Sequence, residues 1–157
     1  MWTGTILNND CDANDDGNEG CGVQFAQNTF GPSFNQQGGG WFAMERTNTA
    51  ISIWFWPRSS TTVPTGVKNG NADVITDNWG TPVASFPNTD CNLASEFQAH
   101  NVVINLTFCG VWAGLTSSWD ITCAASTGVS DCNTYVDSNP AAFSNAYFEI
   151  NSIRIYE

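Results

Sequence analysis

Apolar and polar residues alternate with a period of two along much of this chain, which indicates β-strands rather than long helices. Residues 41–47 and 50–56 form two such runs. The short polar link Asn48-Thr49 between them predicts a β-hairpin. A shorter strand is expected at 83–86, where a proline on each side bounds the apolar residues.

Two further apolar runs predict strands in the second half of the chain, at 102–108 and 147–156. The second run is apolar on both faces, so we expect a central, closing strand there. Residues 93–97 and 131–136 each predict a turn or two of helix. No internal repeat or linker is visible, so the pattern indicates one all-β sandwich domain over residues 1–157.

Charge and composition narrow the classes of partner. The 157 residues carry a net charge of −11 with four Lys and Arg, a field that repels phosphate backbones and anionic lipid. Nucleic-acid binding and membrane-surface binding are therefore not expected, and no apolar stretch is long enough to span a bilayer. Neutral polar residues together with 7 Trp suit an uncharged, hydroxyl-rich ligand such as a glycan.

The cysteines indicate an oxidising compartment. Their even number, the low lysine content and the sequon Asn105-Leu106-Thr107 predict a secreted, disulfide-bonded protein that is glycosylated at Asn105. Cys11 and Cys21 bracket one loop and are expected to form a bridge, whereas the pairing of the other four stays open. Metal ligation is the alternative, weakened by the lack of a CxxC pair and by a single histidine. The cysteines expected in bridges are Cys11, Cys21, Cys91, Cys109, Cys123 and Cys132.

The N-terminal segment shows no basic and apolar signal-peptide pattern. A secreted protein without that pattern is expected to be a mature or trimmed form, or to begin inside a longer parent.

An acidic loop near the N-terminus resembles the first half of a calcium-binding loop. Asp12, Asn14 and Asp16 alternate as oxygen ligands, and Gly17 allows a sharp turn. The bidentate glutamate expected at the twelfth loop position is absent, because Val23 stands there. The sequence therefore leaves two interpretations open: a weak calcium site, or an acidic loop closed by a disulfide.

The run NVVINLTFCGVWAG, residues 101–114, ends in a glycine-framed bend that presents Trp112. An indole held in this way can act as a platform for a sugar ring, because its face stacks on the C–H face of the sugar. The competing interpretation is an ordinary core strand followed by a buried tryptophan.

Four blocks of sequence carry a resemblance to a known family. They are GGGWFAMERTNTAISIWFWPR, TDNWGTPVASFPNTDC, NVVINLTFCGVWAG and NAYFEINSIRIYE, in this order. The chain resembles the C-terminal half of fungal laminarinase-type enzymes of glycoside hydrolase family 16. Those enzymes are secreted endo-β-1,3(4)-glucanases, and the resemblance implies a jelly-roll, concanavalin-like β-sandwich that is truncated at its N-terminal side.

The catalytic residues of that family have no counterpart in this chain. The family uses two glutamates on one strand, in a motif of the form E-I-D-x-x-E, which lies upstream of the region that this chain resembles. A retaining glycosidase needs its two carboxyl groups about 5–5.5 Å apart. No two glutamates of this chain have the spacing of that motif, and none of them sits in such a motif, so no catalytic residue is assigned. The glutamates are Glu19, Glu45, Glu96, Glu149 and Glu157.

The resemblance implies three glucan-binding residues: Trp112, Glu45 and Trp79. Trp112 matches the tryptophan of the family motif C-G-D-W-A-G, although Val111 replaces the acidic residue of that motif. Glu45 either faces the cleft or is a solvated surface residue supported by Arg46. Trp79 is either a sugar platform or a plug in a loop. The other strand tryptophans are expected in the core.

These observations leave three functional hypotheses. The first is a non-catalytic, lectin-like β-glucan-binding protein. The second is the C-terminal part of an endo-β-1,3(4)-glucanase that a missing N-terminal half completes. The third and weakest is a fungal defence or immunomodulatory protein. A truncated sandwich also exposes apolar surface, so a homodimer, a complementing N-terminal fragment or a smaller refolded sandwich is expected.

Overall fold

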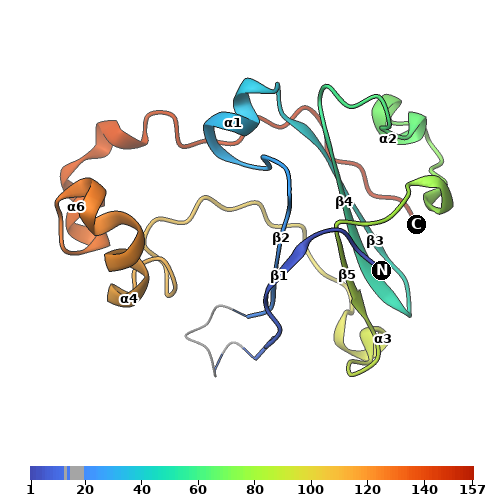
Figure 1. Ribbon diagram of the computed structural model, residues 1–157, viewed down its shortest axis with the longest axis horizontal. Helices are drawn as coiled ribbons and strands as arrows, with labels where there is room; N and C mark the ends of the chain where they lie inside the picture. Colours follow the sequence, from blue (N-terminus) through green and yellow to red (C-terminus); the bar gives the residue numbers. More distant parts are fainter. Residues whose placement is uncertain (13, 15–19) are drawn as a thin grey trace. The chain divides into compact units, whose positions relative to one another are not determined.

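The computed structural model describes residues 1–12, 14 and 20–157 (Figure 1). Contacts divide the chain into two compact units, which are described separately below. The expectation of one domain over residues 1–157 stays a prediction. Among the described helices, none has the length and apolar character needed to cross a membrane. The first unit comprises Met1–Leu7, Gly22–His100 and Arg154–Glu157, and the second comprises Asn8–Cys21 and Asn101–Ile153.

A three-stranded antiparallel sheet forms the centre of the first unit. Strands β3 (Gly40–Arg46) and β4 (Ala50–Pro57) form a hairpin, and β5 (Ala84–Pro87) pairs with the other side of β4 (Figure 1). Phe42 lies opposite Phe55 in the register of the hairpin. The predicted hairpin and the predicted short third strand are both confirmed.

One face of this sheet, which we call the tryptophan face, holds the main core. Trp54 and Trp56 are buried, and Trp79 packs edge-on against both, with ring centroids 5.2 and 5.9 Å away. The indole nitrogen of Trp54 donates to the carbonyl of Gly80 at 3.0 Å, so its polar atom is satisfied. Because alternate strand residues share a face, the tryptophan face consists of Trp41, Ala43, Glu45, Ser52, Trp54 and Trp56.

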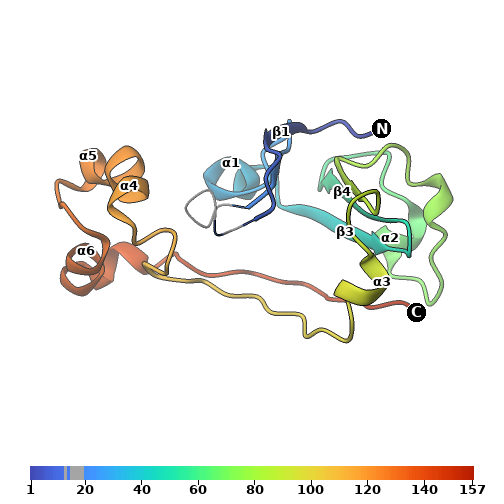
Figure 2. The same ribbon diagram turned by 90° about the horizontal axis from the view of Figure 1, so that it is seen from below.

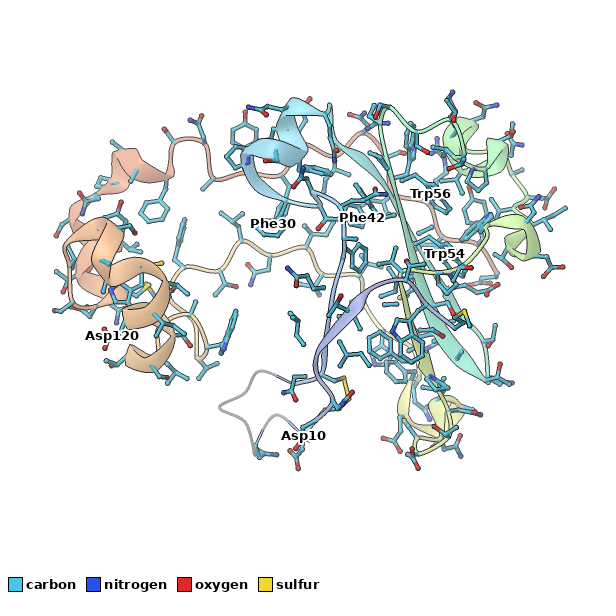
Figure 3. All side chains as sticks on the ribbon, in the orientation of Figure 1. Asp10, Phe30, Phe42, Trp54, Trp56 and Asp120 are labelled. Carbon is cyan, nitrogen blue, oxygen red and sulfur yellow. A yellow bond between two sulfur atoms is a disulfide. The ribbon has the colours of Figure 1, made fainter. Side chains whose placement is uncertain are left out.

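The opposite face, which we call the phenylalanine face, is only partly covered. The ring of Phe55 is buried beneath Phe25, Phe34 and Phe42, with centroids 4.7 to 6.5 Å apart. Met44 lies beyond this cluster and is exposed. Figure 3 shows Phe42 on the other side of the sheet from Trp54 and Trp56. The phenylalanine face includes Phe42, Met44, Arg46, Ile51, Ile53, Phe55, Ala84 and Phe86.

Short elements surround the sheet. Strand β1 (Thr5–Asn8) pairs with β2 (Gly22–Gln24), and helix α1 (Gly31–Gln36) supplies the Phe34 ring that packs on Phe42 and Phe55. Helix α3 (Leu93–Glu96) begins at an Asn92 cap and confirms the helical turn predicted there. The other short elements are α2 (Thr65–Asn69) and the 3₁₀ turn η1 (Thr76–Asn78).

The second unit is held together by short helices and aromatic rings. Phe143 contacts both Phe108 and Tyr135, and Tyr135 contacts Trp119, with centroids 4.9 to 5.9 Å apart. Trp119 is buried, and its indole nitrogen donates to the carbonyl of Val129 at 2.8 Å. The elements are α4 (Thr116–Trp119), the π-helical turn η2 (Asp120–Ala124), α5 (Ala125–Thr127), α6 (Cys132–Ser138) and the 3₁₀ turn η3 (Pro140–Phe143), and Figure 2 shows α4 to α6. Helix α6 confirms the second predicted helix.

The strands predicted at 102–108 and 147–156 are wrong for this structure. Both stretches run as extended traces without strand pairing, and most of their apolar side chains are exposed (Figures 1 and 2). A strand is stable only when a neighbouring strand satisfies its backbone N–H and C=O groups. The alternation is present in both runs, but no described strand pairs with either of them.

Replacing Trp79 by alanine should strongly destabilise the first unit. The side chain is only 9% exposed and fills the space over Trp54 and Trp56, so its removal leaves a cavity that costs about 3–5 kcal/mol. Trp112→Ala is the matched control, because Trp112 is 51% exposed and should change the free energy of unfolding by about 0.5 kcal/mol or less. Urea unfolding followed by circular dichroism measures both. Equal losses in the two variants would contradict the assignment of Trp79 to the core.

Candidate functional site

Trp112 stands in a tight turn of the second unit. The amide of Gly114 donates to the carbonyl of Gly110 at 3.0 Å, and the amide of Leu115 donates to the carbonyl of Trp112 at 3.1 Å. A Cβ at Gly114 would collide with the carbonyl of Cys109, so only glycine fits that position. The turn leaves half of the Trp112 side chain exposed, and the expected exposed indole is therefore present.

A disulfide anchors this turn to helix α6. Cys109 bonds to the buried Cys132, and its Cα lies 5.6 Å from that of Cys132. Cys109 also has a φ of +56°, the single positive value among the described non-glycine residues. Backbone in this region costs free energy for a residue with a side chain, so the surrounding contacts must hold it. The disulfide thus fixes the backbone three residues before Trp112.

The start of helix α6 is fixed by its own cap. The side chain of Asp131 accepts from the amide of Thr134 at 2.8 Å. This backbone hydrogen bond, with a smaller side-chain contribution from Thr134, lowers the pKa of Asp131, because it stabilises the charged carboxylate. Cys132 follows the cap directly and therefore has a defined position from which to hold Cys109.

Glu45 and Trp79 belong to the first unit. Glu45 is half-buried on the tryptophan face, opposite Ser52, whose hydroxyl lies 3.4 Å from that of Ser85. Arg46 does not support it, since its guanidinium donates to the carbonyl of Phe97 at 2.7 Å. The structure thus corrects the interpretation of Glu45 as an Arg46-supported surface residue and leaves its role in a cleft as a prediction.

Trp79 is not a sugar platform in this structure. Its ring is buried against Trp54 and Trp56, which is the plug that the sequence left as the alternative. The ring of the partly buried Trp41 is covered by Arg58, whose guanidinium carbon lies 4.2 Å from the centre of the ring. The sequence did not indicate this cation–π contact. Among the three predicted binding residues, Trp112 alone presents a largely open aromatic side chain.

The cysteines form two disulfides, not three. Cys11–Cys21 is confirmed, and Cys109–Cys132 resolves one pairing that the sequence left open. Cys91 and Cys123 are free thiols, so the expectation of bridges at these two positions is wrong for this structure. No group of three or more His, Cys, Asp or Glu side chains able to hold a metal ion occurs in the described part of the chain.

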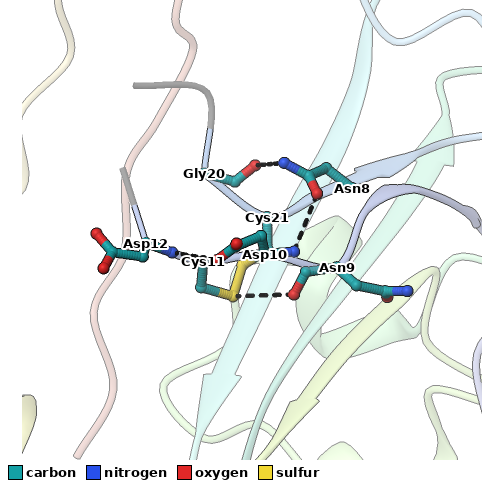
Figure 4. Close-up of a disulfide and its surroundings, with 7 residues drawn as sticks. All are labelled: Asn8, Asn9, Asp10, Cys11, Asp12, Gly20 and Cys21. Carbon is teal, nitrogen blue, oxygen red and sulfur yellow. Dashed lines mark hydrogen bonds between the residues drawn. A yellow bond between two sulfur atoms is a disulfide. The ribbon is translucent and has the colours of Figure 1, made fainter. Parts of the chain in front are cut away.

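Successive polar turns lead into the predicted calcium loop. The side chain of Asn8 accepts from the amide of Asp10 at 3.0 Å, and that of Asp10 accepts from the amide of Asp12 at 2.9 Å (Figure 4). The side chain of Asp12 in turn accepts from the amide of Asn14 at 2.9 Å. The backbone bond from Asn14, and then its side-chain bond at 2.8 Å, lower the pKa of Asp12. Asp16 lies outside the described residues, so calcium binding by Asp12, Asn14 and Asp16 stays a prediction.

The predicted glycosylation site is accessible in this structure. Asn105 is exposed, and its side-chain amide donates to the hydroxyl of Thr107 at 2.5 Å. Glycosylation itself stays a prediction.

A comparison with protein families identifies the chain. The model of the XgeA-like catalytic domain of glycoside hydrolase family 16 matches residues 1–156. The chain belongs to this family. It is 42% identical over 158 aligned residues to a probable endo-1,3(4)-β-glucanase of Aspergillus fumigatus, covering 99% of the chain and 23% of that relative. It is 39% identical to the endo-1,3(4)-β-glucanase XgeA of Emericella nidulans, covering 99% of the chain and 24% of the relative.

Solved structures of family 16 enzymes show the same fold. Laminarinase 16A of Phanerochaete chrysosporium, solved with two β-glucan molecules in its donor and acceptor sites, matches with a TM-score of 0.82 and 53% identity. The match covers 92% of this chain and 48% of the laminarinase chain. An elongating β-1,3-glucosyltransferase of family 16 matches with a TM-score of 0.51 and 36% identity, over 62% of this chain and 31% of that chain. The predicted β-sandwich class is confirmed, and the chain spans about half of the laminarinase fold.

The purified chain should contain two titratable thiols. Cys91 and Cys123 are half-buried and unbridged, so both should react with a thiol reagent after unfolding without reductant. Mass mapping of the labelled peptides should place the label at these two positions and leave the other cysteines unlabelled. A chain with no reactive thiol would instead support a third disulfide.

Proposed function

We propose that this chain is a secreted, non-catalytic β-glucan-binding member of family 16, with Trp112 as its main sugar platform. The exposed indole of Trp112 is the observation that carries the proposal. The disulfide between Cys109 and Cys132 and the turn from Gly110 to Gly114 hold its backbone in place before ligand arrives. A rigid platform binds sugar at a lower entropic cost than a mobile one.

The likeness to laminarinase supports the class of ligand. Laminarinase 16A was solved with β-glucan bound, and it shares 53% of aligned residues with this chain. A hydroxyl-rich, uncharged polysaccharide also suits a chain in which 12% of residues are charged and the net charge is −11. At the position before Trp112, Val111 is exposed where the family motif has an acid. Recognition there would depend more on stacking than on hydrogen bonds.

The sequence supports a non-catalytic role. Retaining glycosidases need a nucleophile and an acid/base carboxyl about 5–5.5 Å apart. Two nearby glutamates on one strand would meet this need, but Glu45 is the sole glutamate within a described strand, and no other glutamate lies within five positions of it. The residues of this chain can therefore position a glucan. No described pair of glutamates supplies both the nucleophile and the acid/base group.

A second candidate function follows from the fraction of its relatives' length that this chain matches. The chain covers 48% of the laminarinase structure, so it would act in hydrolysis if a second polypeptide half supplied the catalytic glutamates. In that arrangement this half would bind and orient the glucan, and the other half would perform the chemistry. No contact among the described residues supports reuse in fungal defence.

Trp112→Ala should weaken glucan binding. Loss of one indole–sugar stack is worth about 0.5–1.5 kcal/mol beyond the buried area, which corresponds to an affinity about 2- to 12-fold lower. Titration of laminari-oligosaccharides, followed by calorimetry, measures the change. Trp112→Phe should retain part of the affinity, because a smaller aromatic face remains. Unchanged binding in Trp112→Ala would contradict the role of Trp112.

The purified chain should release no reducing ends from laminarin above a heat-treated sample. The expected reason is the lack of a catalytic carboxylate pair, so a change of pH should not produce activity. Sustained release that scales with protein concentration would contradict the non-catalytic assignment. Glu45→Gln would then test whether Glu45 takes part.

A further inference from the structure

Arg58 is held in a defined orientation just after strand β4. It follows Pro57 in a turn that the amide of Ser60 closes by donating to the carbonyl of Pro57 at 2.9 Å. The amide of Arg58 donates to the carbonyl of Gly39 at 2.9 Å, and its Nε donates to the carbonyl of Gly38 at 3.2 Å. These bonds fix both the backbone of Arg58 and the base of its guanidinium group.

The indole of Trp41 supports the flat side of this guanidinium group. The guanidinium carbon lies 4.2 Å from the centre of the ring, inside the range of about 6 Å for a cation–π contact. Trp41 in turn packs against the buried cluster of Trp54, Trp56 and Trp79. The guanidinium group of Arg58 therefore rests on a ring that the core of the first unit holds in place.

The guanidinium group of Arg58 has no carboxylate among its partners in the described part of the chain. The chain offers 15 Asp and Glu residues to four Lys and Arg residues, and Arg58 is exposed. Its Nε bonds to Gly38, whereas the two terminal nitrogens donate to no described protein atom. These two nitrogens form the planar fork that binds a carboxylate through two parallel hydrogen bonds. Arg58 thus presents an open anion-binding fork in a fixed orientation.

We propose that Arg58, stacked on Trp41, binds the carboxylate of a uronic acid sugar. The turn supplies groups for the rest of the sugar, since the hydroxyls of Ser60 and Thr62 lie 3.0 Å apart and can exchange hydrogen bonds with sugar hydroxyls. A fork that is fixed before the ligand arrives loses little conformational entropy on binding. The site belongs to the first unit, whereas Trp112 belongs to the second, so it is a sugar site additional to the proposed glucan platform.

The net charge of the chain decides between classes of anionic ligand. A charge of −11 repels a polyanion such as a nucleic acid or a heavily sulfated glycan. A uronic acid carries one carboxylate on an otherwise neutral, hydroxyl-rich ring, so it opposes this field with a single charge. A simple carboxylate without hydroxyls would engage Arg58 but would leave Ser60 and Thr62 without a role.

The test titrates D-glucuronate into the isotopically labelled chain and follows the Nε–H signal of Arg58 and the indole N–H signal of Trp41 by NMR. We expect saturable shifts of both signals. D-Glucuronamide, in which a neutral amide replaces the carboxylate, should bind about fivefold more weakly or less tightly still, because it loses the charge-assisted hydrogen bonds. Acetate, which keeps the carboxylate but lacks the ring hydroxyls, should also bind more weakly than glucuronate.

Two arginine variants separate the fork from its charge. Arg58→Lys keeps the positive charge but loses the planar fork, so glucuronate binding, followed at Trp41, should weaken about tenfold. Arg46→Lys is the matched control, because Nη1 of Arg46 already donates to the carbonyls of Phe97 and Gln98 at 2.7 and 3.4 Å. This control should bind glucuronate like the parent chain.

Three outcomes would overturn the proposal: no saturable shift with glucuronate, equal binding of glucuronate and glucuronamide, or equal losses in Arg58→Lys and Arg46→Lys. Equal binding of acetate and glucuronate would overturn the assignment to a sugar. The comparison of ligands uses the unaltered chain, so it does not depend on the folding of a variant. Trp112→Ala should leave glucuronate binding unchanged, which keeps this site distinguishable from the glucan platform.

Discussion

A β-sheet is stable only when its backbone is paired and its faces are covered. This requirement explains which strands of the chain form and which of their apolar side chains are buried. The hairpin of β3 and β4 pairs its own backbone, and Trp79 covers one face by packing on Trp54 and Trp56. That face provides the main buried core. The other face has only Phe25 and Phe34 over Phe55, so its outer part at Met44 stays in solvent. The same requirement explains why apolar runs without partner strands remain extended traces.

Local signals in the sequence predicted the elements whose hydrogen bonds are local. The hairpin and the helices α3 and α6 each satisfy their backbone within a few residues. Strand β5 is the exception, because its partner β4 lies far from it in sequence, with Ala50 opposite Pro87 and Ile53 opposite Ala84. The runs at 102–108 and 147–156 have equally good alternation, yet neither forms a strand. The alternation of apolar and polar residues specifies which residues would lie on each face of a strand. Whether a strand forms depends on a partner, and that partner is not encoded in the run itself.

The candidate site shows the same division between local and non-local information. Trp79 and Trp112 both lie within two residues of a glycine in blocks shared with the family, but one is buried and the other is exposed. Burial was decided by Trp54 and Trp56, which lie more than twenty residues before Trp79. The bridge within one loop, Cys11–Cys21, was predictable, whereas the free thiols were not, because distant pairing depends on the tertiary fold.

Binding and catalysis place different demands on this fold, and the part of it that this chain matches meets the demands of binding more closely. A stacking platform needs one indole with a fixed backbone, and Trp112 obtains it from contacts within its own unit: the Cys109–Cys132 bridge and the Asp131 cap. Retaining hydrolysis needs two carboxyl groups on one paired strand at a narrow spacing. The described residues therefore offer a fixed indole at Trp112, whereas their strands hold a single glutamate, Glu45.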